Sequence, residues 1–186
     1  GKFKCVVIDA PFVNASTSCI GVDHRRAQYE VAAKTVMENN CKRILYIAGK
    51  RNGYVTDERI RGMEDLVKEK NLTMLVRNGE FSELQARNIT LKYAKNKDIV
   101  VCASDLMAIG AMKALIQMDI FRPVCGFDGI ILMGYVGKQM NTVRQDFASI
   151  SESAMEELQE LMNGGYGRNI VMKHSLVRMK YEDIIA

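Results

Sequence analysis

The sequence predicts an α/β fold in which a parallel sheet is covered by helices on both faces. Short apolar runs alternate along the chain with segments that have the 3.6-residue period of amphipathic helices. The apolar runs lack polar alternation, as expected of strands that are buried on both sides. A repeated strand–helix order with such strands is typical of a parallel sheet with crossover helices. The predicted strands are Phe3–Ile8, Arg43–Ala48, Thr73–Val76, Asp98–Ala103 and Val124–Phe127.

The segments between most of these strands have helical periodicity. The clearest one follows Asp98–Ala103, where Leu106, Ile109, Met112 and Leu115 fall on one apolar stripe. The same spacing recurs in three other segments. Helices are therefore predicted at Arg25–Asn39, Glu58–Lys70, Glu83–Lys95 and Leu106–Met118.

The pattern is looser after Phe127. The stretch Gly129–Met140 has the composition of a short helix, although its internal glycines weaken that prediction. Residues 141–146, NTVRQD, indicate a short extended piece. Ala148–Met162 is a clear amphipathic helix that ends in a glycine-rich stop. Residues 169–180, NIVMKHSLVRMK, alternate like a strand with one exposed face.

The composition is that of an ordinary globular protein. The 186 residues are 48% hydrophobic and 26% charged, and interleaved acids and bases give a net charge of +4. A solvated surface explains the short basic pairs better than a nucleic-acid groove does. No apolar run approaches the roughly 20 residues of a membrane-spanning helix, so we expect no membrane partner.

The five cysteines do not form a metal-binding or disulfide pattern. Their number is odd, and no CxxC pair is present. Cys5, Cys102 and Cys125 lie in apolar strand-like runs, which predicts buried thiols. We therefore expect a reducing, cytoplasmic environment, with no metal site and no cofactor.

A polar pair, Ser104 and Asp105, follows the buried strand that ends at Ala103. Ligands of parallel α/β sheets bind beyond the carboxyl ends of the strands, so side chains at this point face a binding crevice. Asp105 is also well placed to cap a helix that begins at Leu106. The cap is the favoured interpretation of Asp105, whereas Ser104 is a candidate ligand contact.

Other predicted strand ends carry polar or aromatic residues too. Arg59 and Arg61 are expected in the first turn of the helix after Ala48, and Phe81 follows the next strand. Asp128 follows Val124–Phe127. Planar donors and acceptors pair with vicinal hydroxyls, and an aromatic ring covers the C–H face of a sugar. The set predicts a site for a polyol, made by Arg59, Phe81, Ser104, Asp128 and Gln145.

Several motifs resemble the lactose-repressor/galactose-repressor family of bacterial transcription regulators. They are CASDLMAIGAMKAL, GFDG, TVRQDF, ERIRGM and IGVDHRRAQYEVAAKTVMENNCKRILYIAG, which cover nearly the whole chain in the family's order. The resemblance is to the effector-binding core, which is akin to periplasmic sugar-binding proteins. It implies a two-lobed α/β core, of the type I periplasmic-binding-protein kind, that binds a sugar or nucleobase and forms homodimers.

The resemblance also implies roles for individual residues. Arg59, three residues before Gly62, matches the effector-binding arginine, and Phe81 matches the aromatic that stacks on the ligand. Ser104 stands where many members have asparagine, which leaves a shorter side chain. Asp128 matches the aspartate of the GFD turn, and Gln145 the polar residue that ends TVRQ. Asp23 matches a position at the lobe crossing that sometimes contacts ligand, although a helix cap is favoured for it.

The resemblance predicts that the chain holds one nearly complete lobe and part of another. Residues 1–21 and 147–168 are expected to belong to a partial N-terminal lobe. Residues 22–146 and 169–186 are expected to form the C-terminal, effector-binding lobe. We identify no helix-turn-helix motif within this sequence. We therefore expect operator DNA to be contacted only through a segment outside it.

Dimerisation is expected to involve the helix AIGAMKAL and the edge at Asp119–Phe121. The methionines of this region, Met107, Met112 and Met118, are compatible with either core or dimer surface. The family resemblance favours a contribution of this helix to a side-by-side homodimer.

Three other classes remain as alternatives. An enzyme is disfavoured because the chain has no G-x-S-x-G, Walker or H-E-x-x-H motif. His24, expected in the first turn of a helix, and His174, expected on a solvated strand face, have no nucleophile nearby in a recognisable frame. A periplasmic sugar-binding component of an ABC transporter shares the fold and the polyol chemistry. A pure interaction module would bind no sugar.

Overall fold

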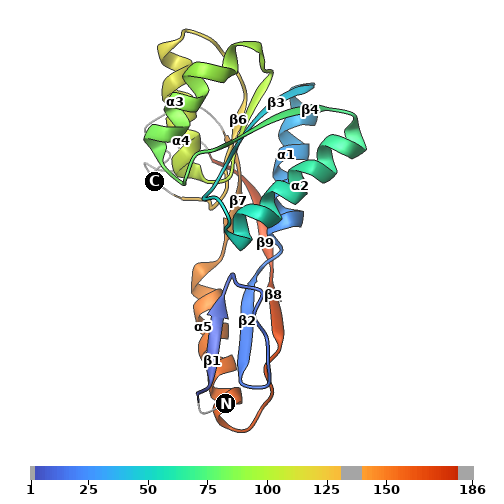
Figure 1. The fold of residues 1–186 in the computed structure, drawn as a ribbon, viewed down its shortest axis with the longest axis vertical. Coiled ribbons are helices and arrows are strands. Elements are labelled where there is room, and N and C mark those ends of the chain that lie inside the picture. The colour runs from blue at the N-terminus through green and yellow to red at the C-terminus, as the bar shows by residue number, and fades with distance from the viewer. Residues whose placement is uncertain (1–2, 131–139, 180–186) are drawn as a thin grey trace. The chain divides into compact units, whose positions relative to one another are not determined.

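The computed structural model of the protein describes residues 3–130 and 140–179. It divides into two compact units (Figure 1). The smaller unit contains the residues up to Asp23 together with Gln145–His174, and the larger unit contains His24–Arg144 and the chain from Ser175. Each unit has its own, mostly parallel sheet, which confirms the predicted fold class.

The smaller unit is a three-stranded parallel sheet with one helix. The strand order is β1-β2-β8, and both pairings are parallel. The middle strand was not predicted from the sequence, and the third strand is shorter than the extended segment predicted at residues 169–180. The elements are β1 (Cys5–Ile8), β2 (Thr17–Val22), α5 (Phe147–Met162) and β8 (Asn169–Met172).

A buried carboxylate joins α5 to the sheet of the smaller unit. Glu157 is 2% exposed. The hydroxyl of Ser18 on β2 donates to its Oε1 at 2.6 Å, and Arg168 Nε donates to its Oε2 at 2.9 Å. These hydrogen bonds, with that of Arg168 the stronger, lower the pKa of Glu157 below its ordinary value. The buried charge is therefore compensated by two partners, as stability requires.

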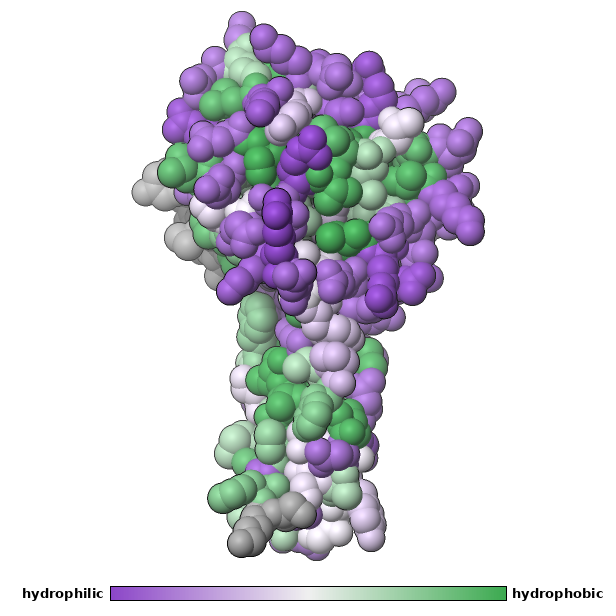
Figure 2. Space-filling model, viewed as in Figure 1, coloured by the Kyte–Doolittle hydropathy of each residue, from purple (hydrophilic) through white to green (hydrophobic). Residues whose placement is uncertain are grey.

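Hydrophobic side chains gather on the visible face of the smaller unit (Figure 2). Phe3, Ile8 and Phe12, in and around β1, are among its exposed large apolar residues. Within the described residues β1 pairs with β2 alone, so its other edge carries no strand. An exposed apolar edge of this kind favours association.

The larger unit is built on a six-stranded sheet in the order β4-β3-β5-β6-β7-β9. The strand β3 pairs in parallel with both β4 and β5, so the chain order reverses between β3 and β5. Ligands of such sheets bind where the order reverses, at the carboxyl ends of the strands. The strands are β3 (Arg43–Ala48), β4 (Thr73–Asn78), β5 (Ile99–Cys102), β6 (Val124–Cys125), β7 (Met140–Gln145) and β9 (His174–Met179).

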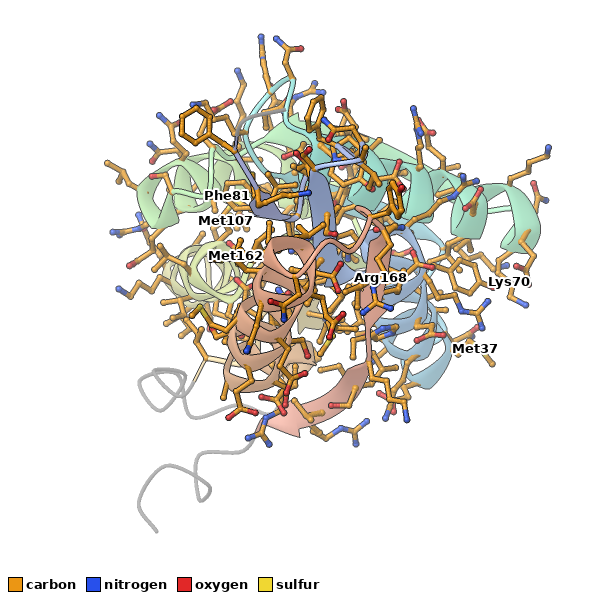
Figure 3. The ribbon with its side chains drawn as sticks, turned by 90° about the horizontal axis from the view of Figure 1, so that it is seen from below. Met37, Lys70, Phe81, Met107, Met162 and Arg168 are labelled. Carbon is orange, nitrogen blue, oxygen red and sulfur yellow. The ribbon has the colours of Figure 1, made fainter. Side chains whose placement is uncertain are left out.

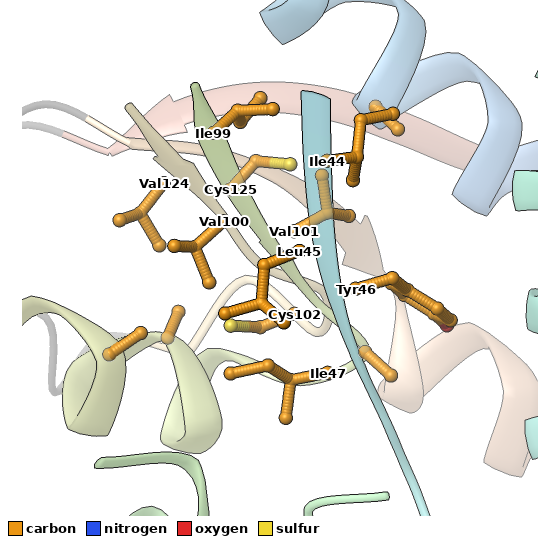
Figure 4. Close-up of a cluster of buried hydrophobic side chains, with 14 of the residues drawn as sticks. Ile44, Leu45, Tyr46, Ile47, Ile99, Val100, Val101, Cys102, Val124 and Cys125 are labelled. Atoms are coloured by element: carbon orange, nitrogen blue, oxygen red, sulfur yellow. The ribbon is translucent and has the colours of Figure 1, made fainter. Parts of the chain in front are cut away.

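Two pairs of helices cover the two faces of this sheet (Figure 1). The buried side chains of β3, β5 and β6 form the core between them (Figure 4). These strands are apolar on both sides, as the predicted parallel arrangement requires. The helices are α1 (His24–Glu38), α2 (Tyr54–Lys70), α3 (Glu83–Tyr93) and α4 (Asp105–Gln117), with a 3₁₀ turn, η1, at Ala94–Asn96.

A glycine allows close packing within each helix pair. A Cβ placed on Gly62 of α2 would lie 2.2 Å from the carbonyl oxygen of Arg25 on α1. A Cβ placed on Gly110 of α4 would lie 2.1 Å from the carbonyl oxygen of Glu83 on α3. Within each pair, the two helices therefore come so close at these points that backbone packs against backbone.

The predicted helix ends differ from the structure at one important place. The helix α2 begins at Tyr54, after Gly53 in an extended conformation, and not at Glu58. Arg59 and Arg61 therefore lie in its second turn, and the expectation of a first-turn position was wrong. The predicted helix at Gly129–Met140 falls almost entirely on residues 131–139, which lie outside the described residues.

Candidate functional site

The guanidinium group of Arg59 lies at the point where the strand order of the larger unit reverses. The side chain is 4% exposed. Its Nη1 donates to the carbonyl oxygen of Ala103, the residue that follows β5. This bond directs the arginine of α2 to the carboxyl end of the central strand, where a ligand of this fold class would bind.

Two aromatic rings hold the same guanidinium. His24 Nδ1 lies 3.4 Å from Arg59 Nε and 3.3 Å from Nη2. The Arg59 Cζ lies 3.6 Å from the centroid of the Phe127 ring, a cation–π distance. The His24 ring stacks on Phe127 with centroids 5.9 Å apart. Arg59 is therefore fixed before any ligand is present.

The carboxylate of Asp128 is the nearby negative charge. Its Oδ1 lies 4.0 Å from Arg59 Nη2, and its side chain is 28% exposed. Asp128 follows β6 and has a φ of 117°. Its N–H donates to the carbonyl oxygen of Val143 at 2.8 Å. A non-glycine residue at such a φ is strained and persists only where its surroundings fix it, which is common at binding sites.

The helix cap after β5 is Ser104, and the sequence interpretation of Asp105 as the cap was wrong. Ser104 is extended, and its Oγ accepts a hydrogen bond from Met107 N at 3.3 Å. The helix α4 begins at Asp105 itself. A serine hydroxyl is as good an N-cap as aspartate, so the residue pair allowed either choice. The Ser104 hydroxyl keeps one hydrogen to donate.

Asp105 is fully buried and binds the segment that follows β6. Thr142 Oγ1 donates to its Oδ1 at 2.7 Å, and Ile130 N donates to its Oδ2 at 2.8 Å. Burial raises the pKa of Asp105 to about 7, and the hydrogen bonds from Thr142, Ile130 and Gly129 oppose that rise. The carboxyl group therefore links α4 to Ile130 and Thr142, a role that no local sequence pattern indicates.

Phe81 lies at the carboxyl end of β3 and β4. Its side chain is 36% exposed, and a Cβ placed on Gly49, the residue after β3, would lie 2.1 Å from its ring. Phe81 has a φ of 56°, which is uncommon for an aromatic residue. Figure 3 labels Phe81 and also Met107 of α4, whose Sδ would lie 2.6 Å from a Cβ placed on Gly79. The ring therefore covers the end of β3 with one part accessible.

The other two predicted site residues, Asp23 and Gln145, belong to the smaller unit. Asp23 is exposed and precedes α1, and Gln145 is a buried residue at the end of β7. The residues gathered at the strand ends of the larger unit are Arg59, Phe81, Ser104 and Asp128.

Sequence reasoning missed two members of this group. His24 is the first residue of α1, as expected, but it is 3% exposed and bound to Arg59. Phe127 had been treated as the end of a strand. The signal available was that a histidine and a phenylalanine flank the two polar positions Asp23 and Asp128. His174, the first residue of β9, is half-buried.

A second buried polar pair is formed by Tyr46 on β3 and Gln28 on α1. Tyr46 OH donates to Gln28 Oε1 at 3.2 Å, and burial raises the pKa of the phenol. Both residues are fully buried, and Gln28 Nε2 has no hydrogen-bond partner within residues 3–130 and 140–179. In the same described ranges, no cluster of three His, Cys, Asp or Glu side chains has a metal-binding arrangement.

The chemistry of the group is that of binding. A carboxylate accepts two hydroxyl hydrogens, a guanidinium donates to hydroxyl or carbonyl oxygens, and an aromatic ring packs on C–H bonds.

The helices of the larger and smaller units, as far as they are described, are too short or too polar to cross a bilayer.

Comparison with known proteins identifies the family. The family described as Periplasmic binding protein-like domain matches residues 33–181. The HTH-type transcriptional regulator MalR of Clostridium butyricum is 28% identical over 171 residues, which are 86% of this chain and 51% of MalR. The match to such a regulator confirms the resemblance found in the sequence. The chain spans about half the length of the curated relatives it matches.

Two solved structures show the same fold. A transcriptional regulator CelR–cellobiose complex has a TM-score of 0.80 and 22% identity, covering 87% of this chain and 53% of that one. An ABC transporter periplasmic solute binding protein from Actinobacillus succinogenes 130z, with bound D-allose, has a TM-score of 0.78 and 20% identity, covering 91% and 63%. With most of its length matched by the family, the chain belongs to the periplasmic binding protein-like domains.

Proposed function

We propose that the larger unit binds a neutral small molecule, a sugar or a nucleobase, at the carboxyl ends of its strands. The protein to which the chain belongs is a transcription regulator of the lactose-repressor/galactose-repressor family, and the bound molecule is its effector. Arg59 and Asp128 pair with hydroxyl groups, Ser104 donates a hydrogen bond, and Phe81 packs on a ring face. Asp23 and Gln145 are further contacts of the same proposal.

The observation that carries this proposal is the buried Arg59 beside the partly exposed Asp128. Burying an arginine is costly unless it is paired, and here it is held by a carbonyl, an imidazole and an aromatic ring. Such preorganisation reduces the entropic cost of binding a ligand. The carboxylate, in contrast, keeps accessible surface with which to accept hydroxyl hydrogens.

A thermal-shift screen with a panel of sugars and purines tests the proposal first. Calorimetry with the compounds that raise the Tm then measures affinity in Asp128→Asn and Arg59→Lys. Asp128→Asn removes the charge of an acceptor, and Arg59→Lys removes the planar pair of N–H donors, so we expect each change to cost about 1.5–3 kcal/mol of binding free energy. Arg61→Ala is the matched control, because Arg61 is exposed on the same helix turn and pairs with Glu58.

The control variant should bind like the wild type. Equal affinity in all three variants, or a panel without any thermal shift, would contradict the proposed site. The second outcome would favour a pure interaction module. A compound consumed during the measurement would instead favour an enzyme, because a regulator returns its effector unchanged.

The organisation of the whole regulator is part of the same proposal. The smaller unit, Gly1–Asp23 with Gln145–His174, is our candidate for part of an N-terminal lobe, and the larger unit is our candidate for the C-terminal lobe; these boundaries replace the expected ones at 21/22, 146/147 and 168/169. Effector binding alters operator affinity through a helix-turn-helix outside this chain, with a coupling of about 1–3 kcal/mol. We place the protein in the cytoplasm, a proposal supported by its free cysteines, of which all but the half-buried Cys5 are buried.

A homodimer is the proposed assembly. Ile116 on α4 and Phe121 after it are exposed apolar residues beside Pro123, and they support a contact at this edge. Light scattering at increasing concentration tests it. Phe121→Ser should shift the protein towards monomer, and a wild type that stays monomeric at high concentration would contradict the dimer.

A periplasmic component of an ABC transporter is the second candidate, since the D-allose-binding neighbour has this fold. The regulator predicts that the gene encodes a helix-turn-helix before this chain, whereas the transporter component predicts a secretion leader. Reading the coding sequence upstream separates the two.

A further inference from the structure

The buried Asp105 carboxyl group lies under the segment that carries Asp128. Its Oδ2 accepts from the backbone N–H of Ile130, and the N–H of Gly129 also contributes a hydrogen bond to it. Its own N–H donates to the carbonyl oxygen of Phe127 at 2.7 Å. Asp105 therefore contacts the chain on both sides of Asp128.

The conformation of Asp128 requires such support. Its φ of 117° is a strained value for an aspartate, and its N–H is tied to β7 through the Val143 carbonyl. On the other side of the residue, the contact with Asp105 fixes Gly129 and Ile130. The two attachments together set where the Asp128 carboxylate points.

The fit around Asp105 is close. A Cβ placed on Gly126 would lie 2.2 Å from Asp105 Oδ1, and the same oxygen accepts from Thr142 Oγ1 on β7. The carboxyl group therefore joins the start of α4, the end of β6 and the middle of β7. Because the packing leaves no room for the carboxyl group to shift alone, a change in its hydrogen bonds moves the 127–130 segment.

We propose that Asp105 is a positioning residue of the binding site, whose carboxyl group holds the 127–130 segment so that the Asp128 side chain faces Arg59. The relevance to binding rests on the proposed function. The positioning itself does not, because it is a property of the unliganded protein.

The protonation state of Asp105 controls this positioning. The ionised carboxylate accepts these hydrogen bonds as charge-assisted bonds, whereas protonation removes the charge, weakens them and turns one oxygen into a donor. Burial raises the pKa of Asp105 to about 7, so the change occurs near neutral pH. Among the described residues, the titratable groups that interact with Asp105 are Asp128 on the 127–130 segment, Cys102 on β5 and Cys125 on β6. Burial raises the pKa of both thiols, so they stay neutral throughout this range.

Nuclear magnetic resonance of the unliganded protein tests the proposal. The backbone amide signals of Gly129 and Ile130, and the Nε–Hε signal of Arg59, are followed from pH 5 to pH 9. We expect all three to titrate together with a midpoint near neutral pH in the wild type. In Asp105→Asn the titration of all three signals should disappear.

Asp57→Asn is the matched control, because Asp57 is an exposed aspartate in the first turn of α2. It should keep the wild-type titration. Thr142→Val provides a second test if Asp105→Asn fails to fold. It removes one hydrogen bond that favours the ionised form, so the midpoint should move to higher pH while the three signals still titrate together.

The proposal is overturned if the Gly129 and Ile130 amides titrate in Asp105→Asn as they do in the wild type. It is also overturned if they titrate while the Arg59 signal does not respond, because Asp128 would then be positioned independently. None of these measurements uses a ligand. A failed sugar screen would therefore reject the proposed function and leave this result standing.

Discussion

His24 accepts a hydrogen bond from Arg59 through Nδ1, which lies 3.4 Å from Nε and 3.3 Å from Nη2 of the guanidinium. A guanidinium group has donors and no acceptor, so Nδ1 must present its lone pair. The neutral imidazole with its hydrogen on Nε2 is therefore the form that fits this contact. The first residue of α1 thus fixes the central cation of the candidate site.

Replacing His24 should destabilise the larger unit. His24→Ala removes an acceptor from a buried charged donor, a change that costs about 1.5–3 kcal/mol of unfolding free energy. In His24→Asn the side-chain oxygen can take the place of Nδ1, so most of the loss should be restored. Urea unfolding of the three proteins measures the difference. Equal stability of His24→Ala and the wild type would show that the contact contributes nothing.

Gly62 should not tolerate a methyl group. Alanine is the better helix former by about 0.8–1 kcal/mol, yet a Cβ here would lie 2.2 Å from the Arg25 carbonyl oxygen. Overpacking against backbone costs about 1–3 kcal/mol, so Gly62→Ala should lower the free energy of unfolding. Glu64→Ala, at an exposed position of the same helix, is the control and should change it by less than about 0.5 kcal/mol. A stabilised Gly62→Ala would mean that the two helices can separate without cost.

The sequence predicted the larger unit well because its strands are apolar on both sides and its helices are periodic. These signals are local, and they located β3, β5 and α4 to within a residue or two. The strand β2 was missed because Ser18 and Gly21 interrupt its apolar pattern. The reason for that polar residue is Glu157, which is 139 positions away and cannot be seen from the strand itself.

The candidate site was predictable only as far as its positions at strand ends. Arg59, Phe81 and Asp128 follow from the rule that parallel strands end at one edge. The role of Asp105 was misjudged because its partners Ile130 and Thr142 lie 25 and 37 residues away. A local pattern shows a carboxylate near a helix start, and such a residue is most simply explained as a cap.

Gly49→Ala should move the Phe81 ring with little loss of stability. The added Cβ would lie 2.1 Å from Phe81 Cζ, which is the far end of a partly exposed side chain. The ring can turn away into solvent, so we expect a change in unfolding free energy below about 1 kcal/mol. The Phe81 ring signals in an NMR spectrum should shift, while those of the Tyr93 ring, which lies against Arg77, should not. An unchanged Phe81 spectrum would show that the ring does not rest on Gly49 in solution.

Asp98 should make the larger unit sensitive to acid. Its carboxylate accepts from Arg43 Nη2 at 2.7 Å and Nε at 3.1 Å, and from the backbone N–H groups of Lys42 and Arg43. The hydrogen bond from the Arg43 side chain is the largest cause that holds the pKa of Asp98 well below its ordinary value. The strand β3 begins at Arg43, so this carboxylate fixes the start of β3.

The direction of the pH effect follows from the lowered pKa. The ionised carboxylate contributes stability above the ordinary aspartate pKa of about 4, and this contribution is lost as the pH falls below that value. The Tm of the wild type should therefore fall more steeply between pH 5 and pH 2 than that of Asp98→Asn. Calorimetric scans of both proteins, with Asp57→Asn as a control for the loss of one exposed charge, measure the slopes. Parallel curves for the wild type and Asp98→Asn would show that Asp98 is bound no better in the folded protein than in the unfolded chain.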